Sequence, residues 1–152
     1  MNESTLPPLW TCPKCGAQFI SKNLWHSCVT GLKLEDLFAK SEPQVLELFR
    51  RFEKLVRECG PVTRIVQKSR AIFMVRVRFA GASPRKSYLN CGFFFKRKVA
   101  SPRFWKMEHL GRSDYAQYTR IRSLDEFDGE FKAWLREAYA VGEQRHLMVK
   151  SR

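Results

Sequence analysis

The stretch RAIFMVRVRF, residues 70–79, alternates between a uniformly apolar face and a face that carries arginines. The odd-numbered positions from 71 to 79 are Ala, Phe, Val, Val and Phe, whereas Arg70, Arg76 and Arg78 fall on the other face. Successive side chains of a β-strand point to opposite faces. This period of two therefore predicts a half-buried strand over residues 70–79.

The same period continues after a turn predicted at residues 81–84. RKSYLNCGFFFKRK, residues 85–98, is expected to form a long strand with Leu89, Cys91, Phe93 and Phe95 facing the core. Two further strands are predicted over residues 104–110 and 115–122, joined by a turn at residues 111–114.

Helices bracket these strands. A short helix is predicted over residues 34–39, and a longer one begins after Ser41 and ends at Gly60-Pro61. Ser123 and Glu126 have the spacing of a capping box, which predicts a long C-terminal helix from Leu124. Antiparallel strands between helices indicate an α+β fold with a sheet of about four to five strands.

The string CPKCGAQFISKNLWHSC, residues 12–28, contains one histidine and three cysteines at metal-ligand spacing. We predict that Cys12, Cys15, His26 and Cys28 bind one structural zinc ion as a zinc knuckle, because four protein ligands leave no open position for catalysis. The alternative is a redox-active CxxC pair with an unrelated His and Cys. We expect Trp10 and Trp25, which flank the ligands, to pack on the main domain instead of offering an exposed stacking surface.

Charge is distributed unevenly along the chain, which has 28 basic and 15 acidic residues and a formal charge of +13. The segment from Cys59 to Met107 holds 12 Lys and Arg and no Asp or Glu, which leaves 16 basic residues beside the 15 acids elsewhere. A positive field confined to one segment favours an anionic partner.

The predicted strands combine cations and aromatic rings, a pattern that suits phosphates and unstacked bases. We therefore expect nucleic acid to be bound through charge and shape more than through base sequence. The candidate contacts are Arg76, Arg78, Lys86, Tyr88, Phe94, Lys96 and Lys98. The alternative is a regulatory or binding module for an acidic protein or a small anionic ligand.

The sequence gives little support for an enzyme or a membrane protein. It has no phosphate-binding loop, no GxSxG elbow and no HExxH motif. Its apolar runs are far shorter than the about 20 residues of a membrane-spanning helix. The first ten residues, MNESTLPPLW, lack the features of a signal peptide. We expect a cytoplasmic protein without a catalytic site.

These patterns divide the chain into four parts. We expect a flexible arm over residues 1–8, a zinc-binding module over 9–31, a basic α+β domain over 32–148 and a tail over 149–152.

From Trp10 to His146 the chain resembles the bacterial family called domain of unknown function 5655 (DUF5655). The matching stretches are WTCPKCGAQF, LWHSC, LEDLF, RECGPV, RVRFAGASPRK, PRF and WLREAYAVGEQRHL. The resemblance implies a cytoplasmic bacterial α/β domain, here preceded by the zinc module. It implies no catalytic residues.

The zinc assignment predicts about one zinc ion per purified chain, a stoichiometry that follows from one four-ligand set. Cys15→Ser should unfold the N-terminal module and leave the main domain folded, because metal binding supplies the folding energy of so small a module. Metal analysis and circular dichroism measure the two effects. Zinc-free protein, or a native Cys12–Cys15 disulfide, would contradict the assignment.

Overall fold

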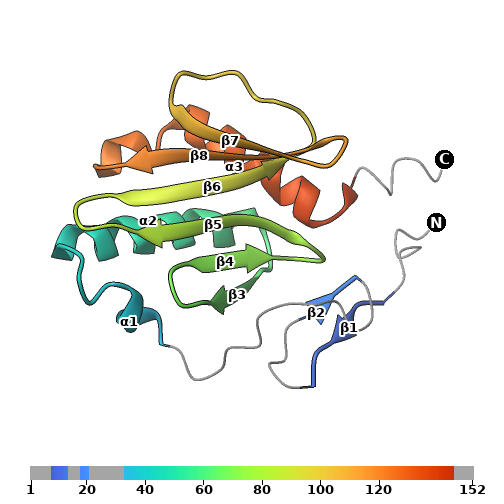
Figure 1. Ribbon diagram of the computed structural model, residues 1–152, viewed down its shortest axis with the longest axis horizontal. Coiled ribbons are helices and arrows are strands. Elements are labelled where there is room, and N and C mark those ends of the chain that lie inside the picture. Colours follow the sequence, from blue (N-terminus) through green and yellow to red (C-terminus); the bar gives the residue numbers. More distant parts are fainter. Residues whose placement is uncertain (1–7, 14–17, 21–32, 146–152) are drawn as a thin grey trace.

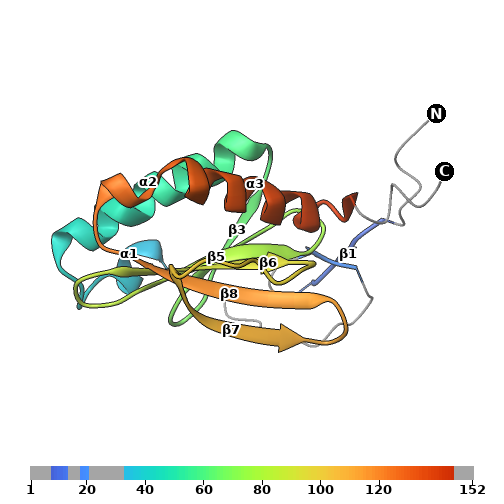
Figure 2. The ribbon, with the colours of Figure 1, turned by 90° about the horizontal axis from the view of Figure 1, so that it is seen from above.

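The computed structural model describes residues 8–13, 18–20 and 33–145. A six-stranded antiparallel sheet forms one layer, with the strand order β3-β4-β5-β6-β8-β7 (Figure 1). The strands are β3 (Thr63–Val66), β4 (Ala71–Met74), β5 (Arg78–Pro84), β6 (Leu89–Phe95), β7 (Phe104–Leu110) and β8 (Asp114–Ile121). The helices α2 (Pro43–Cys59) and α3 (Gly129–Gly142) form a second layer on one face of the sheet (Figure 2).

Two short helical elements complete the main domain: α1 (Leu34–Leu37) and the 3₁₀ helix η1 (Leu124–Glu126). The strands β1 (Trp10–Thr11) and β2 (Gln18–Phe19) form a separate two-stranded ribbon. None of the helices within the described ranges is long and apolar enough to cross a membrane.

The core lies between the sheet and the two long helices and is rich in phenylalanine. Phe93 of β6 packs against Phe52 of α2 and Phe131 of α3, with ring centroids 6.4 and 5.2 Å apart. In the strand predicted over residues 85–98, all residues expected to face inward are fully buried, namely Leu89, Cys91, Phe93 and Phe95. The sequence prediction of the inner face of this strand is therefore confirmed.

The expected strand over residues 70–79 is interrupted, and this break together with the additional strand β3 gives the sheet six strands instead of four to five. The backbone N–H groups of Arg76 and Val77 both donate to the carbonyl of Gly142 at the end of α3. These bonds divert the chain after Met74, so that β4 and β5 are separate, paired strands. The turn predicted at residues 81–84 is consequently wrong, because those residues belong to β5.

Other boundaries also differ from the sequence prediction. β3 was not predicted, and residues 85–88 form the turn before β6 instead of its first residues. Ser123 and Glu126 do form the capping box, but it caps η1. The long helix begins only at Gly129, where the Asp128 carboxylate accepts a hydrogen bond from the N–H of Phe131.

The β1–β2 ribbon packs beside β3 and β4 through a small cluster of its own. Cys12 and Phe19 are buried there, with Trp10 and Ile65 of β3 packed against them. Trp10 packs within the ribbon, with its ring centroid 6.3 Å from that of Phe19, and its expected packing on the main domain stays a prediction. Cys12 is the one predicted zinc ligand within the described residues, since Cys15, His26, Cys28 and also Trp25 lie outside them. The described ranges alone contain no group of three or more metal-ligating side chains.

Truncation of Phe131 to Ala should lower the free energy of unfolding by about 3–5 kcal/mol, because it leaves a cavity between both helices and the sheet. Its ring lies 5.9 Å from Phe52 and 4.9 Å from Phe127, centroid to centroid. Chemical denaturation measures the loss, and the exposed neighbour substitution Lys132→Ala is the control. A loss below about 1 kcal/mol would contradict this account of the core.

Candidate nucleic-acid interface

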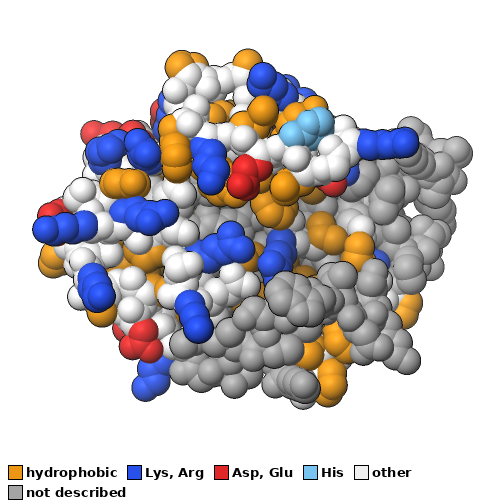
Figure 3. Space-filling view, in the orientation of Figure 1, with side chains coloured by type: hydrophobic (Ala, Val, Ile, Leu, Met, Phe, Trp, Pro, Cys, Tyr) orange, Lys and Arg blue, Asp and Glu red, His pale blue; other side chains and the backbone are white. Residues whose placement is uncertain are grey.

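The face of the sheet that is turned away from α2 and α3, here called the open face, carries the candidate site. Strand register identifies its residues, because directly paired residues point to the same face. One row runs from Ile72 through Gly81, Gly92 and Tyr118 to Lys106, across five adjacent strands. The open face is the one that Figure 3 presents.

The paired Gly81 and Gly92 leave a shallow hollow in the middle of the open face. A Cβ atom on Gly92 would lie 2.8 Å from the ring of Tyr118, so only glycine lets this ring lie over β6. The hollow has a volume of about 60 Å³, and its rim includes Arg70, Arg78 and Phe94. Aromatic rings and guanidinium groups are thus among the side chains that line the hollow.

A stack of cations and aromatic rings lies next to the hollow, where the turn before β6 and the end of β8 meet β7. The guanidinium carbon of Arg120 is 4.1 Å from the ring centroid of Trp105 and 5.5 Å from that of Tyr88. Arg122 lies 5.0 Å from the same Tyr88 ring. The indole N–H of Trp105 donates to the side-chain carbonyl of Asn90 at 3.0 Å, which fixes the orientation of the ring. We call Tyr88, Trp105, Arg120 and Arg122 the cation–aromatic stack.

Four arginines of the open face have no carboxylate partner among the described residues. None of the ion pairs in the described part of the chain involves Arg70, Arg78, Arg120 or Arg122. The Nε atom of Arg120 is buried without a hydrogen-bond partner. Burial lowers the pKa of the Arg78 guanidinium, and the charge of Arg70 lowers it further. Both effects disfavour the charged form of Arg78, which a nearby anion would stabilise.

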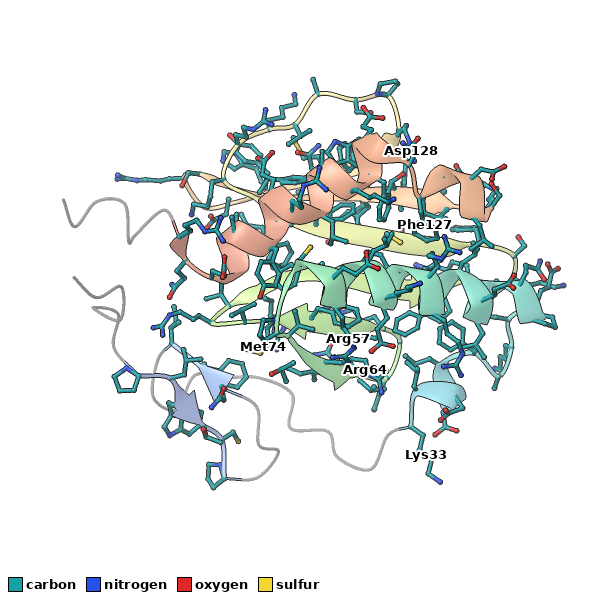
Figure 4. All side chains as sticks on the ribbon, turned by 180° about the vertical axis from the view of Figure 1, so that it is seen from behind. Lys33, Arg57, Arg64, Met74, Phe127 and Asp128 are labelled. Atoms are coloured by element: carbon teal, nitrogen blue, oxygen red, sulfur yellow. The ribbon has the colours of Figure 1, made fainter. Side chains whose placement is uncertain are left out.

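Acidic side chains concentrate on the helix side of the molecule. Strands β3 to β6 contain no Asp or Glu, whereas Glu53 of α2 binds both Arg57 and Arg64. Figure 4 shows this side, with Arg57 and Arg64 near each other and Asp128 at the start of α3. Lys and Arg side chains are more numerous than Asp and Glu on the open face (Figure 3). The charge asymmetry of the sequence has thus become an asymmetry between two faces.

The structure brings together only some of the candidate contacts predicted from the sequence. Arg78 and Phe94 border the hollow, and Tyr88 belongs to the cation–aromatic stack. Lys86 and Lys98 are exposed in the connections before and after β6.

Two other predicted contacts are occupied by partners within the chain. Arg76 donates to the side chain of Gln144 at 2.8 Å, beyond the end of α3. Lys96 pairs with Asp114 at the start of β8.

Sequence reasoning missed Arg70, Trp105, Arg120 and Arg122 as members of the site. For Arg120 and Arg122 the sequence did contain a signal, because positions 118, 120 and 122 of one predicted strand, which share a face, are Tyr, Arg and Arg. What the sequence could not show is that β8 lies between β6 and β7. That order places Arg120 between Tyr88 and Trp105.

Tyr118 links the hollow to the edge strand β7. Its hydroxyl donates to the carboxylate of Glu108 at 2.9 Å, and the Lys106 ammonium lies 5.5 Å from its ring centroid. Burial, followed by the hydrogen bond and the charge of Glu108, raises the pKa of Tyr118 to about 12. The phenol therefore remains neutral and a donor throughout the physiological range.

Comparison with known families matches residues 34–142 to the family described as domain of unknown function (DUF5655). The match spans most of the 152 residues, and the chain belongs to this family. Comparison with curated proteins and with solved structures gave no match.

Glu108→Gln should lower the pKa of Tyr118 from about 12 toward its ordinary value of 10.0, because the amide removes the negative charge beside the phenol. In the wild type, stability contributed by Tyr118 is fully present below pH 10 and is lost as the pH rises toward 12, since only the unfolded chain ionises in that window. NMR titration of the ring measures the pKa. An unchanged value in Glu108→Gln would contradict the assigned cause.

Proposed function

We propose that this member of the DUF5655 family binds single-stranded nucleic acid on the open face of its sheet. The observation that carries the proposal is the cation–aromatic stack, in which Arg120 lies between Trp105 and Tyr88 and takes part in none of the ion pairs among the described residues. Exposed aromatic rings stack on unpaired bases whatever their sequence, and arginines track the phosphates. The expected binding depends on charge and shape more than on base identity.

The hollow and the stack supply complementary contacts for such a strand. Trp105 is 44% exposed, so its ring has free area for a base. The hollow lies beside it, with Phe94 and Tyr118 as aromatic walls and Arg70 and Arg78 on its rim. A nucleotide has a planar base and an anionic phosphate, which correspond to these two kinds of group.

A structural zinc ion bound by Cys12, Cys15, His26 and Cys28 is part of the proposal. Cys12 directly follows β1, and Cys15 lies in the connection between β1 and β2. The ribbon also reaches the open face, because the Arg78 guanidinium lies 5.9 Å from the ring centroid of Phe19. A zinc ion that stabilises this ribbon would therefore hold Phe19 against an arginine of the interface.

A small anionic ligand in the hollow is the second candidate. The proximity of Arg70 and Arg78 without a carboxylate favours it, because two guanidinium groups can share one phosphate or carboxylate. Calorimetric titration with pyrophosphate separates the two candidates. Pyrophosphate binding that Arg78→Ala abolishes, without any binding of oligonucleotides, would favour the small ligand.

Fluorescence anisotropy with single-stranded and duplex oligonucleotides tests the main proposal. Trp105→Ala or Tyr88→Ala should weaken single-strand binding by about 1–3 kcal/mol per lost stack, and duplex binding by less. Arg120→Ala should reduce the slope of log K against log salt by about 0.7, the value for one phosphate contact on a single strand.

Arg97→Ala is the matched control, because Arg97 pairs with Glu137 of α3 at 2.9 Å on the helix side. It removes one positive charge without touching the open face, and we expect it to leave the salt slope unchanged. Dissociation constants weaker than about 10⁻⁴ M for single strands and duplexes alike would refute nucleic-acid binding.

A further inference from the structure

Strand β7 forms one edge of the sheet, and its surface is unusually apolar for an edge. Trp105, Met107 and Leu110 are 44%, 39% and 44% exposed. They are three of the four exposed large hydrophobic side chains in the described ranges, the other being Ile20. Within these ranges β7 pairs only with β8, so its outer backbone groups have no strand partner. A long apolar edge of this kind is a template for another strand.

We propose that two copies of this chain associate through β7, with the two strands antiparallel about a two-fold axis at Met107. The sequence of β7, FWKMEHL, is self-complementary in charge about that residue. In this arrangement Lys106 lies opposite Glu108 of the second copy, and Glu108 lies opposite its Lys106. Opposite charges that face each other across an antiparallel pair stabilise it.

Other registers are unfavourable for the same strand. Directly opposite residues of two antiparallel strands point to the same face. If the two-fold axis passes through a residue, open-face residues of one copy lie opposite open-face residues of the other, and the helix layers of both copies lie on one side. Centring on Lys106 places that lysine opposite its own copy, and centring on Glu108 does the same for the carboxylate. The register centred on Met107 is the one that places two pairs of opposite charges across the interface.

The side chains needed for this pairing are accessible in the single chain. Lys106 and Glu108 are 48% and 44% exposed and lie 3.6 Å apart, nitrogen to oxygen. Both project from the open face, where each can reach the opposing strand without displacing the core. The β-bulge at Trp105 interrupts the β7–β8 pairing, so the regular ladder runs over residues 106–110 and contains both charged residues.

The association would join the two sheets edge to edge, with both open faces on the same side. It depends only on β7 and holds whether or not the open face binds nucleic acid. The protein for the test is therefore the whole 152-residue chain as purified, freed of nucleic acid by nuclease treatment and a high-salt wash.

Sedimentation velocity over a concentration series tests the association with a charge swap. In the Lys106→Glu variant residues 106 and 108 are both acidic, and in the Glu108→Lys variant both are basic. A dimer of either variant would therefore place two pairs of like charges opposite each other. Each should dimerise at least about tenfold more weakly than the wild type. An equimolar mixture of the two variants should recover dimers, because every opposing pair is again of opposite sign.

The mixture distinguishes a contact between two copies from the Lys106–Glu108 contact within one chain, since mixing cannot restore the latter inside either variant. Lys132→Glu on α3 and Glu35→Lys on α1 are exposed matched controls, and both should dimerise like the wild type. A wild type that remains monomeric at millimolar concentration overturns the proposal. So does a wild-type dimer that both single variants retain, or a mixture that remains monomeric while the wild type dimerises.

Discussion

The packing of Phe93 between the two long helices is the constraint on which the rest of the structure depends. Its ring lies 6.4 Å from Phe52 of α2, 5.2 Å from Phe131 of α3 and 6.4 Å from Phe104 of β7, centroid to centroid. With Phe93 turned inward, Gly92 and Phe94 must point outward. Directly paired residues of antiparallel strands point to the same face, so the orientation of β6 also fixes which residues of β5 and β8 point inward. The composition of the open face therefore follows from burial of the core.

Arginines have different partners on the two faces of the domain. On the helix side, Arg103 has two carboxylate partners, Asp128 and Glu130, and also lies over the ring of Trp134. On the open face, aromatic rings take the place of carboxylates around Arg120. Rings compensate a guanidinium less completely than an anion does, so the open face retains a positive field that an anionic ligand can neutralise.

Tyr118 connects the middle of the open face to the sheet edge. Its ring covers Gly92, and its hydroxyl holds Glu108, which lies beside Lys106 on β7. The glycine that opens the hollow therefore also permits the ring that orders the charged pair of the edge strand. The hollow, the cation–aromatic stack and the edge consequently form one continuous surface on β6, β8 and β7.

The sequence by itself determined the inner face of β6, because a period of two depends only on which side chains avoid water. It also determined that the excess of cations lies between residues 59 and 107. Only the tertiary structure decided that residues 70–79 make two strands, since the carbonyl of Gly142 that captures the N–H groups of Arg76 and Val77 comes from the far end of the chain. It also decided the membership of the site. Local patterns carry no information about strand order, and the order β6-β8-β7 is what places Arg120 between the rings of Tyr88 and Trp105.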